Sequence, residues 1–252
     1  MSVSRGAAVL AIVGLLVACA PEPTASELTA KGIANLKSAK TVQIDGAGTI
    51  ALKAQNGLSF NFDFKMSGDA AIPNNARLNV QMALLGMSFN VDTITVDGRG
   101  YTKDPATGKW SQGAAGKAQL NGMMDPLGSI DSSLLRDVVE VDRPEVDGRK
   151  TRHLRYQADT AKMIEDMRKA AGTSTASVSN AQGTGELWIR IDDSQIVRQL
   201  VKVSVDVDAL SGVDVPAAAA NMGKASMEMS LDIHFSHHGE AFPQITAPPV
   251  GP

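Results

Sequence analysis

The 252-residue sequence has few aromatic residues, a single cysteine and no apolar run long enough to cross a bilayer. Aromatic residues make up 4% of the chain against 11 methionines, so the flexible methionine side chain supplies much of the bulk available for packing. One cysteine excludes an intramolecular disulfide. The formal net charge of -3, with Lys and Arg dispersed along the chain, argues against a nucleic-acid surface.

Catalytic motifs are also lacking. The sequence contains no Gly-x-Ser-x-Gly elbow and no His-Glu-x-x-His pair. The glycines of 46–48 lack the rest of a dinucleotide fingerprint. His234, His237 and His238 offer metal ligands, although a solvated strand end also explains them, and the acidic cluster at 137–147 fits a solvated outer face better than calcium binding or acid–base work. We therefore expect no enzyme activity, no cofactor and no metal site.

The N-terminus is laid out like a secretory signal. Arg5 precedes an uncharged run from Ala7 to Ala18, which has the length of a signal-peptide core and is shorter than the ~20 residues of a membrane span. The following Cys19 completes the order Leu-Val-Ala-Cys, which resembles a bacterial lipobox, the site where a cysteine thiol receives a diacylglyceryl group. The alternatives are an ordinary signal with a chance cysteine, or a free thiol in an N-terminal helix.

The lipobox interpretation sets the organisation of the chain. Residues 1–18 are predicted to be a signal peptide, and 19–25 a tether that holds the protein at the extracytoplasmic face of the cell membrane through lipidated Cys19. A lipid anchor of two or more acyl chains binds a membrane stably. Residues 26–238 then form one domain, and 239–252 a proline-rich tail.

Most of the domain alternates with a period of two, which is typical of strands with one apolar and one polar face. The pattern is clearest in LSFNFDFKM and recurs in ARLNVQMALL and ASMEMSLDIHF. The apolar positions of these strands are Phe60, Phe62, Phe64, Met66, Leu78, Val80, Met82, Met227, Met229, Leu231 and Phe235. In MSFNVDTITV the alternation changes face after Val91, which predicts a β-bulge near Asp92–Thr93.

Helices and loops interrupt this pattern. Helical spacing predicts a helix over Ser26–Ala39 with Ser26 as N-cap, and another from Asp159 to Gly172 with Met163 and Met167 on its apolar face. The Ser/Thr/Gly-rich segment Gly172–Gly185 and the segment Ser211–Lys224 are interpreted as irregular loops.

Together these elements predict a single α+β domain. Roughly ten strands, mostly joined by hairpins, indicate an antiparallel sheet that curls into a half-barrel, with a few helices covering its concave face. These helices are too few to fill the concavity completely. A ligand fills the remainder in one interpretation, and side chains close a dry core in the other.

Several segments carry a family resemblance. The lipobox, the N-terminal helix, GYTKDPATGKW, MMDPLGSIDSSLL and GELWIRIDDSQIVRQL together resemble the mycobacterial LppX/LprG/LprA/LprF lipoprotein family, which is related in fold to LolA-type carriers. The resemblance implies a half-barrel around a hydrophobic cavity closed by helices. It also implies binding of multi-acyl lipids or glycolipids and their movement toward the outer envelope.

We therefore predict an anchored carrier of acylated lipids or glycolipids. The apolar strand positions given above would line its cavity, with Met163 and Met167 on a covering helix. The predicted partners are the lipid, the membrane and an envelope transporter, and we expect a monomer. The alternative is an anchored structural or protein-interaction module of the envelope, with a filled core and no ligand.

Overall fold

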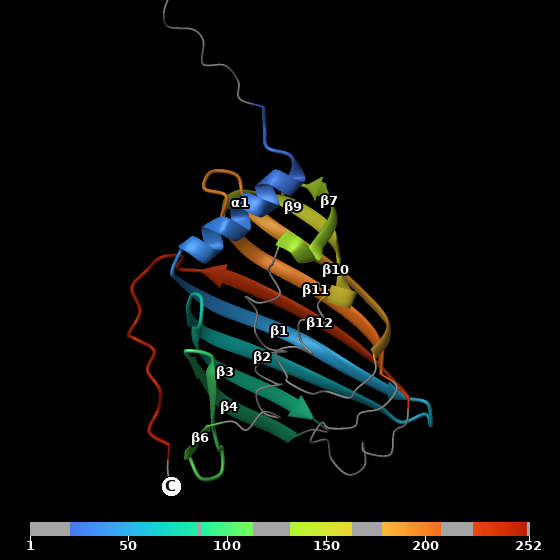
Figure 1. Cartoon of the computed structure of the whole chain (residues 1–252), viewed down its shortest axis with the longest axis vertical. Helices are drawn as coiled ribbons and strands as arrows, with labels where there is room; N and C mark the ends of the chain where they lie inside the picture. The colour runs from blue at the N-terminus through green and yellow to red at the C-terminus, as the bar shows by residue number, and fades with distance from the viewer. Residues whose placement is uncertain (1–20, 85–86, 113–131, 163–177, 208–223, 251–252) are drawn as a thin grey trace, which may run out of the picture.

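The computed structural model describes residues 21–84, 87–112, 132–162, 178–207 and 224–250 (Figure 1). Its elements are α1 (Ala25–Ser38), β1 (Thr41–Ala54), β2 (Ser59–Ala71), β3 (Asn75–Leu84), β4 (Met87–Val96), β5 (Arg99–Lys103), β6 (Trp110–Gln112), the 3-10 turn η1 (Ser132–Leu134), β7 (Leu135–Asp142), β8 (Glu145–Val146), β9 (Arg149–Ala158), β10 (Val178–Arg190), β11 (Ile196–Val207) and β12 (Ala225–Ser236).

One curled, unclosed sheet organises the whole domain. Its strand order is β6-β5-β4-β3-β2-β1-β12-β11-β10-β9-β7, with β8 paired to β9, and the pairings are antiparallel. The predicted fold class is confirmed. The described residues form 12 strands where roughly ten were expected, in part because the two-residue β8 is too short to show a periodicity.

Helix α1 covers one end of the apolar face, where it packs against η1, β7, β10 and β11 (Figure 1). It begins after Thr24, so the predicted N-cap Ser26 is wrong. The Thr24 hydroxyl accepts the N–H of Glu27 at 3.2 Å, and the Glu27 carboxylate accepts the N–H of Thr24 at 2.8 Å. This reciprocal capping box satisfies two backbone donors that Ser26 alone would leave unpaired.

The predicted loop Gly172–Gly185 is wrong over residues 178–185, which form the first half of β10. Its glycines stand where large side chains cross the strand. A Cβ at Gly185 would meet Cε1 of Tyr156 at 2.7 Å, and one at Gly183 would meet Cγ2 of Thr160 at 2.7 Å. The composition of a loop therefore conceals a strand that needs glycine for close packing.

Some predicted features lie outside the described residues. They are Cys19, residues 172–177, Met163 and Met167, and the segment 211–223. The predicted cap of the second helix is present, because the Asp159 carboxylate accepts the N–H of Lys162 at 3.2 Å.

The predicted bulge near Asp92–Thr93 is wrong. The β3–β4 pairing runs without a register shift from Ala76–Thr95 to Leu84–Met87. Ile94 consequently lies on the polar face, where its cross-strand partner is the buried Tyr101. The switch of apolar residues after Val91 therefore reflects an apolar region on the outer face of β4 and β5, and no bulge.

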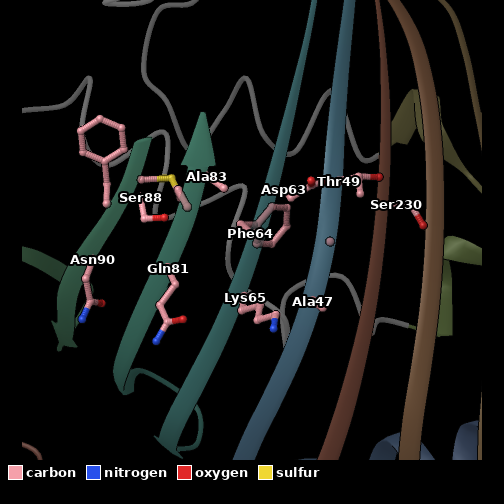
Figure 2. A pocket seen from close by; sticks show the side chains of 13 residues that line it. Ala47, Thr49, Asp63, Phe64, Lys65, Gln81, Ala83, Ser88, Asn90 and Ser230 are labelled. Carbon is pink, nitrogen blue, oxygen red and sulfur yellow. The ribbon is translucent and has the colours of Figure 1, made fainter. Parts of the chain in front are cut away.

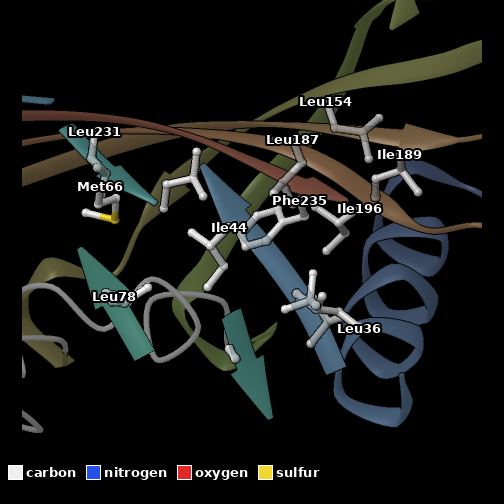
Figure 3. Packing of buried hydrophobic residues seen from close by; sticks show 14 of the residues in the cluster. Leu36, Ile44, Met66, Leu78, Leu154, Leu187, Ile189, Ile196, Leu231 and Phe235 are labelled. Atoms are coloured by element: carbon white, nitrogen blue, oxygen red, sulfur yellow. The ribbon is translucent and has the colours of Figure 1, made fainter. Parts of the chain in front are cut away.

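The core lies between the apolar face of the sheet and α1 (Figure 3). Its α1 members are Leu28, Ile33 and Leu36. Its largest strand members include Ile44, Met66, Leu78, Leu154, Leu187, Ile189, Ile196, Leu231 and Phe235. Burial of this many aliphatic side chains, at about 1.5–3 kcal/mol each, is the main stabilising contribution to the fold.

Gly48 is a close-packing point in the middle of β1. The Phe64 ring of β2 lies across it, and a Cβ there would meet Cε1 of Phe64 at 2.7 Å and the carbonyl oxygen of Ser230 at 2.6 Å. One of these contacts is backbone, so the site cannot relax by a change of rotamer alone.

We predict that Gly48→Val lowers the free energy of unfolding by about 1–3 kcal/mol, because the added side chain overpacks the apolar face. Ala47→Val is the matched control, since Ala47 is the preceding residue and is exposed on the other face. It should change stability by no more than about 0.5 kcal/mol. Urea titration measures both, and equal effects would contradict the proposed crowding at Gly48.

The chain after β12 runs past the ends of the strands and reaches β6, where Val250 pairs with Trp110 (Figure 1, red). Near its start, Nε2 of His238 lies 3.0 Å from the carbonyl oxygen of Ile196, and the N–H of Gly239 donates to the Thr41 carbonyl at 2.9 Å. Burial lowers the pKa of His238 below its usual 6.5.

This depressed pKa predicts a pH dependence of stability. The unfolded chain takes up a proton at His238 near pH 6.5 while the folded chain resists it, so the free energy of unfolding should decrease as pH falls from about 7 to about 5. His238→Gln keeps a donor for the Ile196 carbonyl and should flatten that slope. Urea titrations across this range measure it; an unchanged slope in the variant would exclude His238 as the cause.

Candidate functional site

The apolar face of the sheet divides into a packed end and a half-buried end. On the α1 side of Gly48, the face is buried, as at Ile44, Ile233 and Phe235. On the side toward the β1–β2 hairpin, the apolar side chains keep part of their surface exposed. This second region, which we name the Phe/Met patch, consists of Ile50, Leu52, Phe60, Phe62, Met82, Met227 and Met229.

The strand register assembles the Phe/Met patch from four strands. Leu52 of β1 lies between Phe60 of β2 and Met227 of β12, and Ile50 lies between Phe62 and Met229. Because cross-strand neighbours on one face are about 4.5–5.5 Å apart at Cβ, these side chains form one continuous surface.

The predicted cavity residues therefore fall into three groups. Five lie in the Phe/Met patch, and two, Met163 and Met167, lie outside the described residues. The other six are buried on the same face and all belong to the core cluster: Phe64, Met66, Leu78, Val80, Leu231 and Phe235. The sequence pattern assigns all eleven described residues to one face, but it does not distinguish packed positions from half-buried ones.

A buried polar pair interrupts the apolar face between β9 and β11. The side-chain amide of Gln199 donates to the Tyr156 hydroxyl at 3.2 Å, and both side chains are almost fully buried. Burial raises the pKa of Tyr156 to about 12. The Oε1 atom of Gln199 has no hydrogen-bond partner in the described part of the chain. An alternation of apolar and polar residues gives no signal for such a pair.

Two pockets of the described structure lie on the opposite, polar face. The larger pocket, of about 620 Å³, lies between two rows of cross-strand partners whose side chains point to the polar face (Figure 2). The two rows are two residues apart along each strand. One row contains Ala47, Lys65, Gln81 and Asn90, and the other contains Ser230, Thr49, Asp63, Ala83 and Ser88. The backbone of the intervening row, which includes Gly48 and Phe64, forms the floor.

The smaller pocket, of about 330 Å³, continues this groove across β12, β11 and β10. It shares Thr49 and Ser230 with the larger one. Alanine, serine and threonine account for much of the lining, so short side chains leave the backbone accessible. The short residues that form this groove occupy the polar positions of the alternating strands. From the sequence alone, these positions predict a solvated face and no groove.

Beside this groove, the polar face carries a stacked cluster around Trp188. The His153 ring stacks on the Trp188 indole, with the two ring centroids 4.3 Å apart. The guanidinium carbon of Arg198 lies 4.5 Å from the centroid of the Trp188 ring. Arg198 donates two hydrogen bonds to Asp232, of 2.8 and 2.6 Å, which raise its pKa. These contacts leave Trp188 only 7% exposed, although it lies on the polar, solvent-facing side of the sheet. The cluster is a packing device, since its polar groups are already paired.

The candidate metal ligands have separate partners. His237 lies 2.9 Å from Glu240, His238 contacts the Ile196 carbonyl, and His234 lies 3.8 Å from Asp232. Within the described ranges, no three His, Cys, Asp or Glu side chains are grouped to hold a metal ion. The same ranges contain no helix that is long and apolar enough to cross a membrane.

The buried pair predicts a non-additive mutational effect. Tyr156→Phe leaves the Gln199 amide without its acceptor and should lower the free energy of unfolding by about 1–3 kcal/mol. Adding Gln199→Leu removes the unpaired amide, so the double variant should recover part of this loss. Urea titration of the two variants tests the coupling; a double variant less stable than Tyr156→Phe alone would contradict it.

Comparison with known proteins gives structural neighbours only. No family model matches the sequence, and no curated protein matches it. The chain is similar to LprF from Mycobacterium bovis, with 15% identity, 89% of this chain and 96% of that chain covered, and a TM-score of 0.47. It is similar to the Mycobacterium tuberculosis lipoprotein LppX at 13% identity, 88% and 98% coverage, and a TM-score of 0.42. A LolA superfamily protein from Nitrosomonas europaea aligns at 9% identity over 88% and 96% of the two chains, with a TM-score of 0.31. LprF and LppX are among the lipoproteins that the sequence resembles.

Proposed function

We propose that this protein is a lipoprotein, anchored at the extracytoplasmic membrane face, that binds acylated lipids or glycolipids and carries them within the cell envelope. The observation that carries the proposal is the Phe/Met patch, which continues the packed core of the apolar face but keeps part of its own surface exposed. The protein acts by binding and release, and no catalytic group takes part.

The chemistry of the patch suits acyl chains. Covering about ten methylenes of a chain offsets on the order of 8 kcal/mol of exposure to water, before the losses that accompany binding. Three of its seven members are methionines, whose flexible thioethers adapt to ligands of different shape. A carrier that must also release its cargo benefits from such a wall, because no single rigid contact dominates the affinity.

The predicted anchor supports the same function. Lipidation of Cys19 would hold the protein at a membrane that contains acylated lipids, the proposed cargo. Stable anchoring needs more than one acyl chain, which the lipobox modification supplies.

A filled-core interaction module is the second candidate. Burial of six predicted cavity residues in packed positions favours it, as does the groove on the polar face. In that case the apolar face has only a structural role, and an envelope protein would bind elsewhere. The two candidates differ in one measurable property, which is the presence of bound lipid.

The test is lipid extraction from protein purified under native conditions. The carrier should contain acylated lipid detectable by mass spectrometry, and the emptied protein should take up a fluorescent fatty-acyl probe. Absence of both lipid and uptake would overturn the carrier and leave the module.

Paired variants locate the binding surface. Phe62→Asp places a charge in the Phe/Met patch and should weaken probe uptake at least about tenfold, because burying an unpaired carboxylate is costly. Asn61→Asp adds the same charge to the adjacent exposed residue and should leave uptake unchanged. Circular dichroism and urea titration establish that both variants fold. Equal uptake by two folded variants would place the ligand elsewhere.

A further inference from the structure

The first described residues of the chain are fastened to the sheet. Both Arg143 guanidinium nitrogens Nη1 and Nη2 donate to the Glu22 carboxylate, at 3.1 and 2.6 Å. The neighbouring Pro23 carbonyl accepts a hydrogen bond from Nη1 of Arg152 at 2.6 Å. These contacts join the predicted tether to the segment after β7 and to β9, more than a hundred residues away in sequence.

A shared carboxylate ties the two arginines together. Glu140 of β7 accepts from Nε of Arg143 at 2.6 Å and from Nε of Arg152 at 2.7 Å. Arg152 is only 7% exposed, so the carboxylate of Glu140 and the carbonyl of Pro23 compensate its buried positive charge. The hydrogen bond from Arg143, with its positive charge, lowers the pKa of Glu22. The network therefore remains charged under neutral conditions.

Residues 21–24 of the tether have little conformational freedom beyond these contacts. Prolines at 21 and 23 fix backbone torsions on both sides of Glu22, and the α1 capping box begins at Thr24. Glu22 is three residues after Cys19, a distance of at most about 11 Å at about 3.6 Å per residue. A lipid on Cys19 would thus hold this end of the sheet very close to the bilayer.

We propose that the end of the sheet around the Glu22–Arg143 contact is a fixed membrane-facing surface, so that the tether orients the domain and does not act as a swinging linker. The inference rests on the anchor in the proposed function. The surface consists of the end of β7, the β8–β9 hairpin and the turn between β10 and β11. The hairpin and the turn are joined by the N–H of Ile191 donating to the Lys150 carbonyl at 3.1 Å, and by the Arg149–Asp192 ion pair.

The composition of this surface fits a neutral lipid interface. Val141 and Ile191 are each 42% exposed, which places apolar surface at the same end of the sheet as the tether. The exposed acidic residues Glu145 and Asp147 balance the exposed Arg149 and Lys150 of the same hairpin, so the surface has no strong attraction to anionic lipid. The anchor and the fastened tether thus set the orientation, which should persist in high salt.

Labelled single-cysteine variants test the orientation. Lipidation uses the only native thiol, so a cysteine introduced elsewhere is the single reactive thiol of the full-length protein. Ile191→Cys lies at the proposed membrane-facing end, and Leu58→Cys lies in the exposed β1–β2 hairpin at the opposite end (Figure 1). The labelled proteins are reconstituted into phosphatidylcholine vesicles that contain a headgroup-attached quencher.

We expect several-fold stronger quenching at residue 191 than at residue 58, both at low and at high salt. Equal quenching at the two sites would overturn the inference. This readout needs no cargo, so an empty protein that orients correctly refutes only the carrier, whereas a lipid-loaded protein with equal quenching refutes only the orientation. A mass spectrum without acyl groups on Cys19 would overturn the anchor and the inference together.

Two further variants test the cause of the orientation. Arg143→Gln breaks the contact with Glu22 and should reduce the difference between the two labels, and Arg155→Gln, which removes a nearby pair with Glu186, should leave it intact. A flexible Gly/Ser segment inserted after Ala20 should abolish the difference without touching the folded domain. A difference that survives both Arg143→Gln and the insertion would show that the tether does not set the orientation.

Discussion

The crossing of large rings over glycines is the contact on which the apolar face depends. Phe64 lies across Gly48 and Tyr156 lies across Gly185, each in space that a Cβ would occupy. Because glycine has no Cβ, each ring can lie directly against the backbone of the neighbouring strand, in space that another side chain would fill. Gly48 also lies at the boundary between the packed core and the Phe/Met patch. The apolar face is buried on one side of this glycine and half-buried on the other.

The two faces of the sheet are built from different kinds of side chain. The apolar face is stabilised by burial against α1 at one end, and its other end retains exposed Phe and Met surface. The polar face uses short side chains, which open a groove across the central strands, and stacked groups around Trp188. A helix packed at one end of an antiparallel sheet can close a stable core there while apolar side chains at the other end stay partly exposed.

Local periodicity predicted the strands well where one face was consistently apolar, as in β2 from Phe60 to Met66. It failed where long-range packing decided the outcome. The glycines of β10 resemble a loop until Tyr156 is placed beside them, and Ile94 implied a bulge because its buried partner Tyr101 comes from another strand. Pairs such as Glu22 and Arg143 leave no signal in the local pattern, since 121 residues separate them.

If Cys19 is lipidated as proposed, the fastened tether fixes how far each part of the domain lies from the membrane. From Thr41 to Ala54, β1 advances by about 43 Å at about 3.3 Å per residue, toward the hairpin beside the Phe/Met patch. That length is close to the full thickness of a bilayer with its headgroups, about 40–45 Å. If the β7 end of the domain faces the membrane, the Phe/Met patch lies at the opposite end, away from the membrane. Cargo would then be presented to acceptors away from the membrane that holds the anchor.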